Sequence, residues 1–206
     1  NWLAEALATV AAFAAIAVLV IVVWSVAKRG ASELSWSFLT SDLPLFGLPG
    51  GGIKPLIVGS AVLVAIATAI ALPLGVLTAL FLSEFASRRV ASAIQLTLDL
   101  MNGLPSVIIG VFVFGLLVDG HKMTGYAGGF ALSVVMLPLV ARSTQEVLRL
   151  VPSAQREGAL ALGASRWRTV VGIVLPSSLG GILTGTVLAL ARAAGETAPL
   201  LFTTAI

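Results

Sequence analysis

Five long apolar runs dominate the sequence and restrict what the chain can fold into. A helix that crosses a bilayer needs roughly 20 mainly apolar residues, and five stretches meet this requirement. They are residues 6–27, 56–82, 91–118, 124–148 and 177–198. Strands of transmembrane barrels are about 10 residues long and alternate strictly, whereas these runs are longer and evenly apolar. The pattern therefore predicts an all-α membrane protein, a helical bundle with five spans.

Composition and charge agree with a membrane chain. Of its 206 residues, 58% are hydrophobic and 10% are charged, whereas soluble domains carry about 25% charged residues. The net charge of +3 comes without any basic cluster longer than two residues, so it indicates loop asymmetry rather than nucleic-acid binding. The absence of cysteine and the single histidine argue against a metal centre. We expect membrane lipids as the surroundings and no nucleic-acid partner.

Arginine-rich links fix the expected orientation. The links at 83–90 and 149–168 carry most of the arginines between spans, and the positive-inside rule places them in the cytoplasm. The chain is expected to divide into residues 1–55, a first transmembrane helix with an outward-facing loop, and residues 56–206, a core that includes the cytoplasmic loop at 149–168.

The loop before the fifth run reads "EGALALGASRWRTVVGIVLP". Ser153 is a plausible N-cap and Gly163 a plausible helix stop, which predicts a short helix between them. Gly158 and Ala159 are small enough to let this helix sit in a groove on a partner, and Glu157 can pair with a cation of that partner. The alternative is a surface helix that only joins two spans at the headgroup boundary, although its apolar face consists of Ala rather than Leu or Phe.

This loop resembles the coupling motif of ABC importer permeases: E-A-A, three residues, G, nine residues, I, one residue, L-P. The matching residues are Glu157, Gly158, Ala159, Gly163, Ile173, Leu175 and Pro176. Gly158 stands where the family usually has Ala, and this difference should destabilise the helix by about 1 kcal/mol. The resemblance implies that the loop, with Arg166 in "SRWR", docks in a cleft of an ATPase subunit. The chain has no G-x-x-x-x-G-K-[ST] loop, so we expect no cofactor on it, ATP bound and hydrolysed by a partner, and no enzymatic activity of its own.

Charges inside a membrane are costly and rarely face lipid. Arg192 and Glu196 lie one turn apart in the fifth run, and Gly181 and Gly185 share their helical face as a small-x-x-x-small packing signal. Arginine suits a phosphate-like oxyanion because its donors are planar and paired. We expect Glu196 to reduce the affinity of Arg192 for the anion and to accept a hydrogen bond from a protonated oxygen of the substrate. A structural ion pair that neutralises itself is the alternative.

A second set of candidates lies in the third and fourth runs. Arg142 is deep enough in the fourth run to face a pathway. In "NGLPS", Pro105 interrupts the helix between Asn102 and Ser106, and broken helices at depth are tolerated where they line a cavity. An ordinary proline kink without substrate contact is equally possible there. Asp99 is expected to be simply solvated near the cytoplasmic end.

Three stretches narrow the resemblance: "NGLPSVIIG", "LRLVPSAQREGALALGASRWRTVV" and "GILTGTVLALARAAGETAPLLFTTA". Together they look like the PstA-type permease subunits of bacterial phosphate importers, from about Gly51 to the last residue. The resemblance implies a phosphate pathway that includes Thr197, alternating access and a place in the bacterial plasma membrane. It also implies a second, PstC-type permease, an ATP-binding subunit dimer and an extracytoplasmic phosphate-binding protein as partners. The resemblance implies the transmembrane bundle of type I ABC importer permeases, which have six spans. Because only five are found, we expect the sixth span to be missing and both chain ends to be incomplete.

Three other functions fit parts of the sequence. A permease for another solute or oxyanion, such as molybdate or sulfate, would share the coupling motif. An ion-coupled secondary transporter would account for Asp99, Arg192 and Glu196 but leaves the coupling motif unexplained. An intramembrane hydrolase would lack catalytic residues, because His121 falls in an outward loop and Ser106 has no evident base to activate it as a nucleophile.

Overall fold

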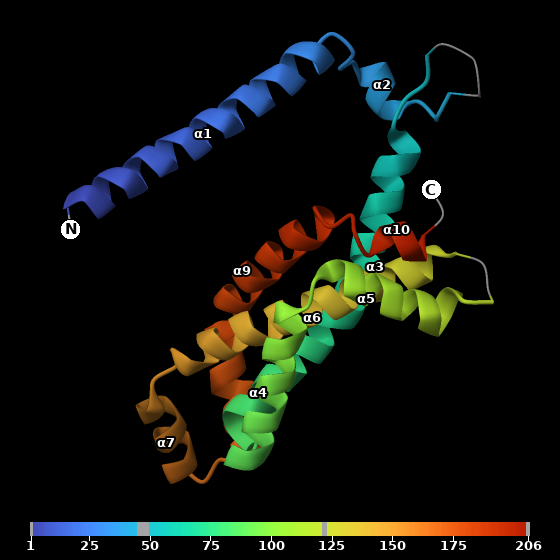
Figure 1. Cartoon of the computed structure of the whole chain (residues 1–206). Coiled ribbons are helices and arrows are strands. Elements are labelled where there is room, and N and C mark those ends of the chain that lie inside the picture. The colour runs from blue at the N-terminus through green and yellow to red at the C-terminus, as the bar shows by residue number, and fades with distance from the viewer. Residues whose placement is uncertain (1, 45–49, 121–122, 205–206) are drawn as a thin grey trace. The chain divides into compact units, whose positions relative to one another are not determined.

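The computed structural model describes residues 2–44, 50–120 and 123–204, which form helices and their connections (Figure 1). Its α-helices are α1 (Trp2–Gly30), α2 (Trp36–Thr40), α3 (Lys54–Leu80), α4 (Arg88–Gly103), α5 (Ser106–Val113), α6 (Gly125–Arg149), α7 (Ser153–Ala161), α8 (Arg166–Thr169), α9 (Leu175–Ala194) and α10 (Leu200–Thr203). Three π-helical segments join them: η1 (Phe81–Phe85), η2 (Phe114–Val118) and η3 (Val170–Val174). The expected all-α class is confirmed, while His121 lies outside the described residues.

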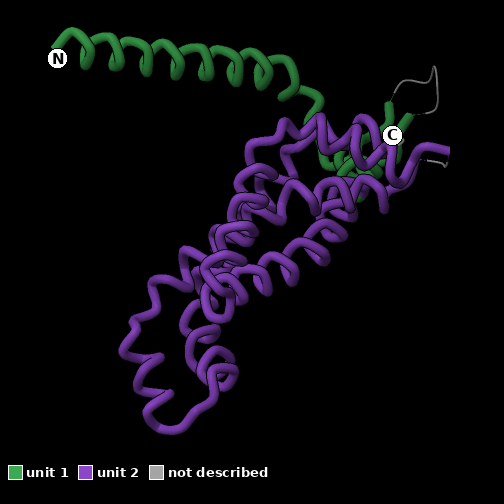
Figure 2. Tube along the Cα trace, turned by 60° about the horizontal axis from the view of Figure 1, so that its bottom comes forward, with its two compact units in different colours: residues 1–58 green, residues 59–206 purple. Residues whose placement is uncertain are grey.

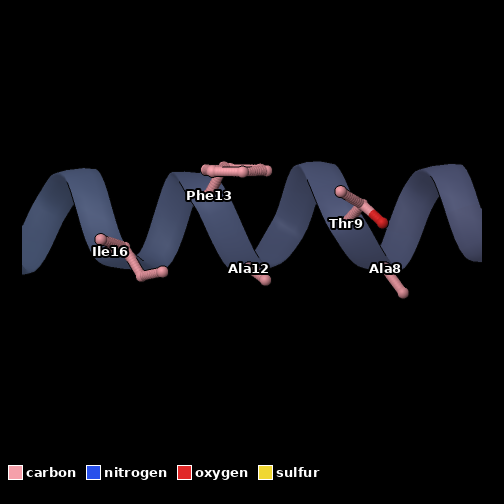
Figure 3. A pocket seen from close by; sticks show the side chains of 5 residues that line it. All are labelled: Ala8, Thr9, Ala12, Phe13 and Ile16. Atoms are coloured by element: carbon pink, nitrogen blue, oxygen red, sulfur yellow. The ribbon is translucent and has the colours of Figure 1, made fainter.

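The chain divides into two compact units, residues 1–58 and 59–206 (Figure 2). In the first unit, α1 has no buried residue, and its 29 residues extend about 44 Å, enough to cross a bilayer. A shallow hollow on its surface is lined by uncharged side chains of α1 itself (Figure 3). Because α1 is apolar all round, lipid or another helix has to cover it.

In the second unit the core lies around α6. Leu132, Met136 and Val140 of α6 are fully or almost fully buried, and they pack in one cluster with Ala189 and Ala193 of α9. Ala67 and Ala71 of α3 belong to the same cluster, and Gly75, one turn further along α3, lies against Val140. Small residues on α3 and α9 bring those helices close to the bulkier α6, as is typical of membrane bundles.

The contact between α6 and α9 is fixed by two glycines. A Cβ atom on Gly181 would lie 2.5 Å from Cγ1 of Val147, and one on Gly185 would lie 2.5 Å from Oγ of Ser143. Real Cβ atoms do not approach other atoms so closely, so only glycine fits at either position. The packing role expected for this glycine pair is confirmed, and its partner is α6 of the same chain.

Substitution of these glycines should therefore destabilise the α6–α9 contact. We expect Gly181→Ala and Gly185→Ala each to lower stability by about 1–3 kcal/mol, because the added methyl group overpacks the interface. Gly180→Ala is the matched control, since nothing lies within 4 Å of a Cβ atom at Gly180. Thermal unfolding of the purified protein in detergent would measure the three effects. Equal melting temperatures for all three variants would contradict the packing assignment.

The break expected at "NGLPS" is present. Helix α4 ends at Gly103 and α5 begins at Ser106, and the two axes are bent by 100°. Four helical stretches are long and apolar enough to cross a membrane, and this bent pair makes five if it counts as one span. The described residues therefore contain four spans of the predicted five, and the third predicted span is a pair of short helices with a sharp bend between them.

The expected limits of the fifth span are wrong at both ends. Helical structure runs without interruption from Arg166 to Ala194, so Pro176 does not begin the span. The π-helical segment η3 precedes Pro176, and the altered hydrogen-bond register there accommodates a residue without an N–H group. At the other end Glu196 lies beyond the helix, so it shares no helical face with Arg192.

Candidate functional site

The short helix predicted in the cytoplasmic loop is α7, and its first turn differs from expectation. Ser153 is already helical, while Pro152 is the N-cap residue and makes no side-chain capping bond. The N-cap prediction for Ser153 is therefore wrong, because Pro152 has the extended ψ of 137° that an N-cap adopts. The predicted stop is confirmed: α7 ends at Ala161, and Gly163 has a φ of +81°, which favours glycine.

Two glycines in this loop should respond oppositely to the same substitution. Gly158 is helical and has free space around a Cβ atom, so Gly158→Ala should stabilise α7 by about 1 kcal/mol. Gly163→Ala should destabilise its end by about 1–2 kcal/mol, since an alanine is strained at positive φ. Hydrogen exchange of the α7 amides would measure both effects. Protection that changes in the same direction in both variants would contradict the assignment.

Arg156 ties α7 to the rest of the bundle. Its Nε and Nη2 atoms donate to Oε1 of Glu84 in η1 at 3.1 and 3.0 Å. Nη1 donates to the carbonyl of Val151 at 2.6 Å, and Nη2 also donates to that of Leu148 at 2.8 Å. Both charged side chains are mostly buried, with 23% of Arg156 and 14% of Glu84 exposed. Arg156 therefore joins the link at 149–168 to the link at 83–90. Both links lie at the same end of the bundle, in agreement with the predicted orientation.

A second contact joins the same two links. The rings of Phe85 in η1 and Trp167 in α8 lie 6.4 Å apart between centroids and are tilted by 40°, within the range of favourable aromatic pairs. The hydroxyl of Ser165 caps α8 by accepting a hydrogen bond from the N–H of Arg168 at 3.4 Å. The chain on both sides of α7 is thus anchored, and Arg166 lies exposed beside it.

The coupling candidates face two directions. Glu157 and Gly158 are exposed on α7, whereas Ala159 is buried against its own chain. Leu162, just after α7, is almost fully exposed. Glu157, Gly158 and Leu162 therefore offer a free surface, while Ala159 holds the helix in place.

Arg142 connects α6 to α4. It pairs with Asp99 and also donates to the backbone carbonyl of Gln95 at 3.3 Å. The expectation that Asp99 is simply solvated is therefore wrong, because the antiparallel packing of α4 and α6 brings these charges together. Gln95, Asp99 and Asn102 are spaced so that they share one face of α4, while Ser106 begins α5 and is half-buried.

The charges at the end of α9 remain close although Glu196 leaves the helix. Nε of Arg192 lies 3.7 Å from Oε1 of Glu196. The Arg192 side chain is 53% exposed and that of Glu196 is 17% exposed. Thr197 is exposed, and its carbonyl accepts the first bonds of α10 from Leu200 and Leu201. The turn is held close to α5, where Gly110 leaves no room for a Cβ atom beside Pro199.

The two charge pairs lie at different levels of the bundle. The contacts of Gly181 with Val147 and of Gly185 with Ser143 place Arg192 level with Met136 on the antiparallel α6. Arg142 lies six residues further along α6, roughly 9 Å away along the axis. Arg142 and Arg192 are therefore two separate positions and do not form one cluster.

Comparison with known proteins adds to this geometry. Residues 71–206 match the model of a family described as "Binding-protein-dependent transport system inner membrane component". This chain belongs to that family. It is a multi-pass inner membrane protein of that family.

The permease is similar to several phosphate transport system permease proteins. It is 38% identical to PstA of Yersinia pestis over 90% of its own length and 63% of that protein's length. It is 40% identical to PstA of Haemophilus influenzae over 88% of its own length and 65% of that protein's length. The chain thus spans just under two thirds of these relatives.

The permease also shares its fold with solved ABC transporters. Inward-facing structures of the MetNI methionine ABC transporter match it with TM-scores of 0.59 and 0.58 at 21% and 23% identity. The first match covers 70% of this chain and 68% of that chain, and the second covers 72% and 71%. These similarities support the type I ABC importer fold that the resemblance to ABC importer permeases implies.

The permease contains two site residues that sequence reasoning missed, Glu84 and Arg156. They are separated by 72 positions, so no local spacing connects them. The only sequence signal was that both lie in links assigned to the same side of the membrane, one acidic and one basic.

Proposed function

We propose that this chain is the permease subunit of an ATP-driven importer of inorganic phosphate. The observation that carries the proposal is its similarity to phosphate permeases at 38–40% identity over 88–90% of its length. In this function the chain forms part of the path for phosphate across the inner membrane. It binds no cofactor itself, and a separate subunit binds and hydrolyses ATP.

The free surface of the α7 loop serves as the contact with the ATPase. Glu157 supplies a charge at the exposed side, Gly158 permits close approach, and Arg166 adds a basic group beyond the turn at Gly163. Ala159 keeps α7 on its own bundle. The tie from Arg156 to Glu84 supports a mechanical role, because movement of α7 then pulls on η1 and on the end of α6.

The phosphate path runs along the charged positions of α4, α6 and α9. Arg192 is the main anion contact, since its side chain is half-exposed and its partner Glu196 lies at the long distance of 3.7 Å. Beside it, the Glu196 carboxylate accepts a hydrogen bond from a protonated oxygen of the phosphate, and the Thr197 hydroxyl donates one. Arg142, paired with Asp99, is a second anion contact nearer the α7 end of the bundle. Asn102 and Ser106 line the path at the break between α4 and α5.

The proposed assembly has three kinds of partner: an ATP-binding subunit dimer, a second homologous permease of the PstC type and an extracytoplasmic phosphate-binding protein. The second permease supplies a surface to cover the exposed apolar helices. The binding protein delivers the anion from outside, and lipid surrounds the remainder.

Reconstitution tests the function. The full-length protein would be placed in liposomes with the proposed partners, and uptake of labelled phosphate, sulfate and molybdate would be followed with ATP on the α7 side. ATP-dependent uptake of phosphate above the other anions supports the proposal. ATP-dependent uptake of sulfate or molybdate instead would change the substrate, and phosphate uptake driven by an ion gradient without ATP would replace the proposal with a secondary transporter.

A further inference from the structure

A polar hollow of about 450 Å³ lies at the α7 end of the bundle. None of Arg142, Asp99, Arg192 and Glu196 lines it, and it adjoins the Arg142 pair only through Gln95, whose carbonyl accepts from Arg142. Segments from η1, α4, α6 and α7 enclose it. Its polar lining residues are Ser83, Glu84, Gln95, Gln145, Arg149 and Arg156. In Figure 1 the same end of the second unit is occupied by α7 and the start of α4.

Two polar groups in this hollow lack protein partners. Gln145 is 3% exposed, and its side-chain amide has no hydrogen bond within the described part of the chain. The Oγ atom of Ser83 is buried and also has no partner there. The Ser83 hydroxyl is buried, and a buried polar group without a hydrogen bond is costly. Gln145 adds an amide without a hydrogen bond on the wall of the hollow, so this site favours a polar ligand that can bond to both groups.

The charges of the hollow favour an anion. Arg156 already neutralises Glu84, the single acidic lining residue. Arg149 also lines the hollow and forms no ion pair with any residue that the structure describes. The site therefore has an excess positive charge, together with amide and hydroxyl donors. Guanidinium groups bind phosphate-like oxyanions through paired, charge-assisted hydrogen bonds.

From this arrangement we infer that the hollow is an oxyanion-binding site for a phosphate group at the cytoplasmic end of the permease. Arg149 provides the free charge, and Gln145 and Ser83 provide neutral hydrogen bonds. The ligand lies next to Arg156, the residue that ties α7 to η1. Its binding therefore bears on the element proposed to contact the ATPase.

Two sources carry the same phosphate chemistry. One is free phosphate on the cytoplasmic side. If that phosphate is the transported substrate, the inference rests on the proposed function. The other is the headgroup of an anionic phospholipid, because the hollow opens at one end of the spanning helices. The two sources are separated by supplying each one alone.

The absence of cysteine from the chain allows a direct occupancy measurement. Gln95→Cys would be the single cysteine of this chain, which would be assembled with cysteine-free partners in nanodiscs of phosphatidylcholine. The rate at which a neutral thiol reagent modifies this cysteine would be followed while inorganic phosphate is added. Glu146→Cys is the matched control, because Glu146 is exposed beside Gln145 on α6 but does not line the hollow.

We expect phosphate to slow modification of Gln95→Cys by about tenfold at ten times its dissociation constant and to leave Glu146→Cys unchanged. Adding Arg149→Ala should lower the affinity for phosphate by about tenfold or more, so that the same phosphate concentration slows modification by about twofold or less. Protection by phosphatidylglycerol nanodiscs without phosphate would assign the site to a lipid headgroup. If neither source protects, or if Arg149→Ala leaves protection intact, the inference is overturned. Uptake by the cysteine-bearing assembly reports separately on the proposed function.

Discussion

Arg156→Ala is expected to reduce ATP-driven phosphate uptake by at least tenfold. The substitution removes four hydrogen bonds and leaves the Glu84 carboxylate mostly buried without its partner. Loss of one member of a buried pair costs about 3–5 kcal/mol, and we expect about 3 kcal/mol because both side chains retain some exposure. The α7 helix would then no longer transmit movement to η1. Uptake and ATP hydrolysis, measured in the same liposomes, would show hydrolysis continuing without transport.

Three further variants make this test specific. Arg168→Ala is the matched control, since Arg168 is an exposed arginine of the same loop without an ion pair in the described residues. Arg156→Lys keeps the charge but loses the paired donors, so it should recover only part of the activity. Glu84→Ala combined with Arg156→Ala should cost less than the two single effects added together. Normal uptake by Arg156→Ala would remove the mechanical role from this pair.

Arg192→Ala is expected to lower phosphate uptake by about 100-fold while the complex still assembles. Loss of a charge-assisted hydrogen bond costs about 1.5–3 kcal/mol, and the upper part of this range corresponds to about 100-fold in rate. The Arg192 side chain is half-exposed in the isolated chain, so its removal should scarcely change folding. Uptake of labelled phosphate together with co-purification of the partners would separate transport from assembly.

The alternative role of Arg192, a purely structural ion pair with Glu196, predicts a different pattern. In that case Arg192→Ala and Glu196→Ala should lower the melting temperature equally and impair transport equally. In the pathway role, Glu196→Gln should retain more uptake than Arg192→Ala, because the anion keeps its cationic partner. Thr184→Ala on the exposed side of α9 is the control for substitution in this helix. Unimpaired uptake by Arg192→Ala would refute the pathway role.

The elements that sequence predicted correctly depend on local chemistry. Apolar length predicts the spanning helices, Pro105 predicts the break between α4 and α5, and Gly163 predicts the end of α7. The packing of Gly181 and Gly185 was also predictable, because small residues four apart form a continuous groove on one helix face. Each of these features is encoded within a few neighbouring residues.

The features that were missed or wrong depend on contacts between distant segments. Asp99 was expected to be solvated, yet α6 brings Arg142 to it from the following span. The helices α4, α5 and α6 separate Glu84 from Arg156 along the chain, so no periodicity reveals this ion pair. The fifth span was expected to begin directly after Pro176, at residue 177, but the preceding π-helical segment allows the helix to continue through this proline. Local patterns could not decide these three cases.

The close contact of α6 with α9 also limits how the permease can change shape. A slip of one turn, about 5.4 Å, would bring Val147 opposite Ser177 in one direction or Ser143 opposite Ala189 in the other. Each slip places a Cβ atom where the present contact tolerates none, and packed interfaces of this kind do not deform gradually. The two helices therefore move together as one rigid body. Bending is left to the joints at its ends, the α7 loop and the turn before α10.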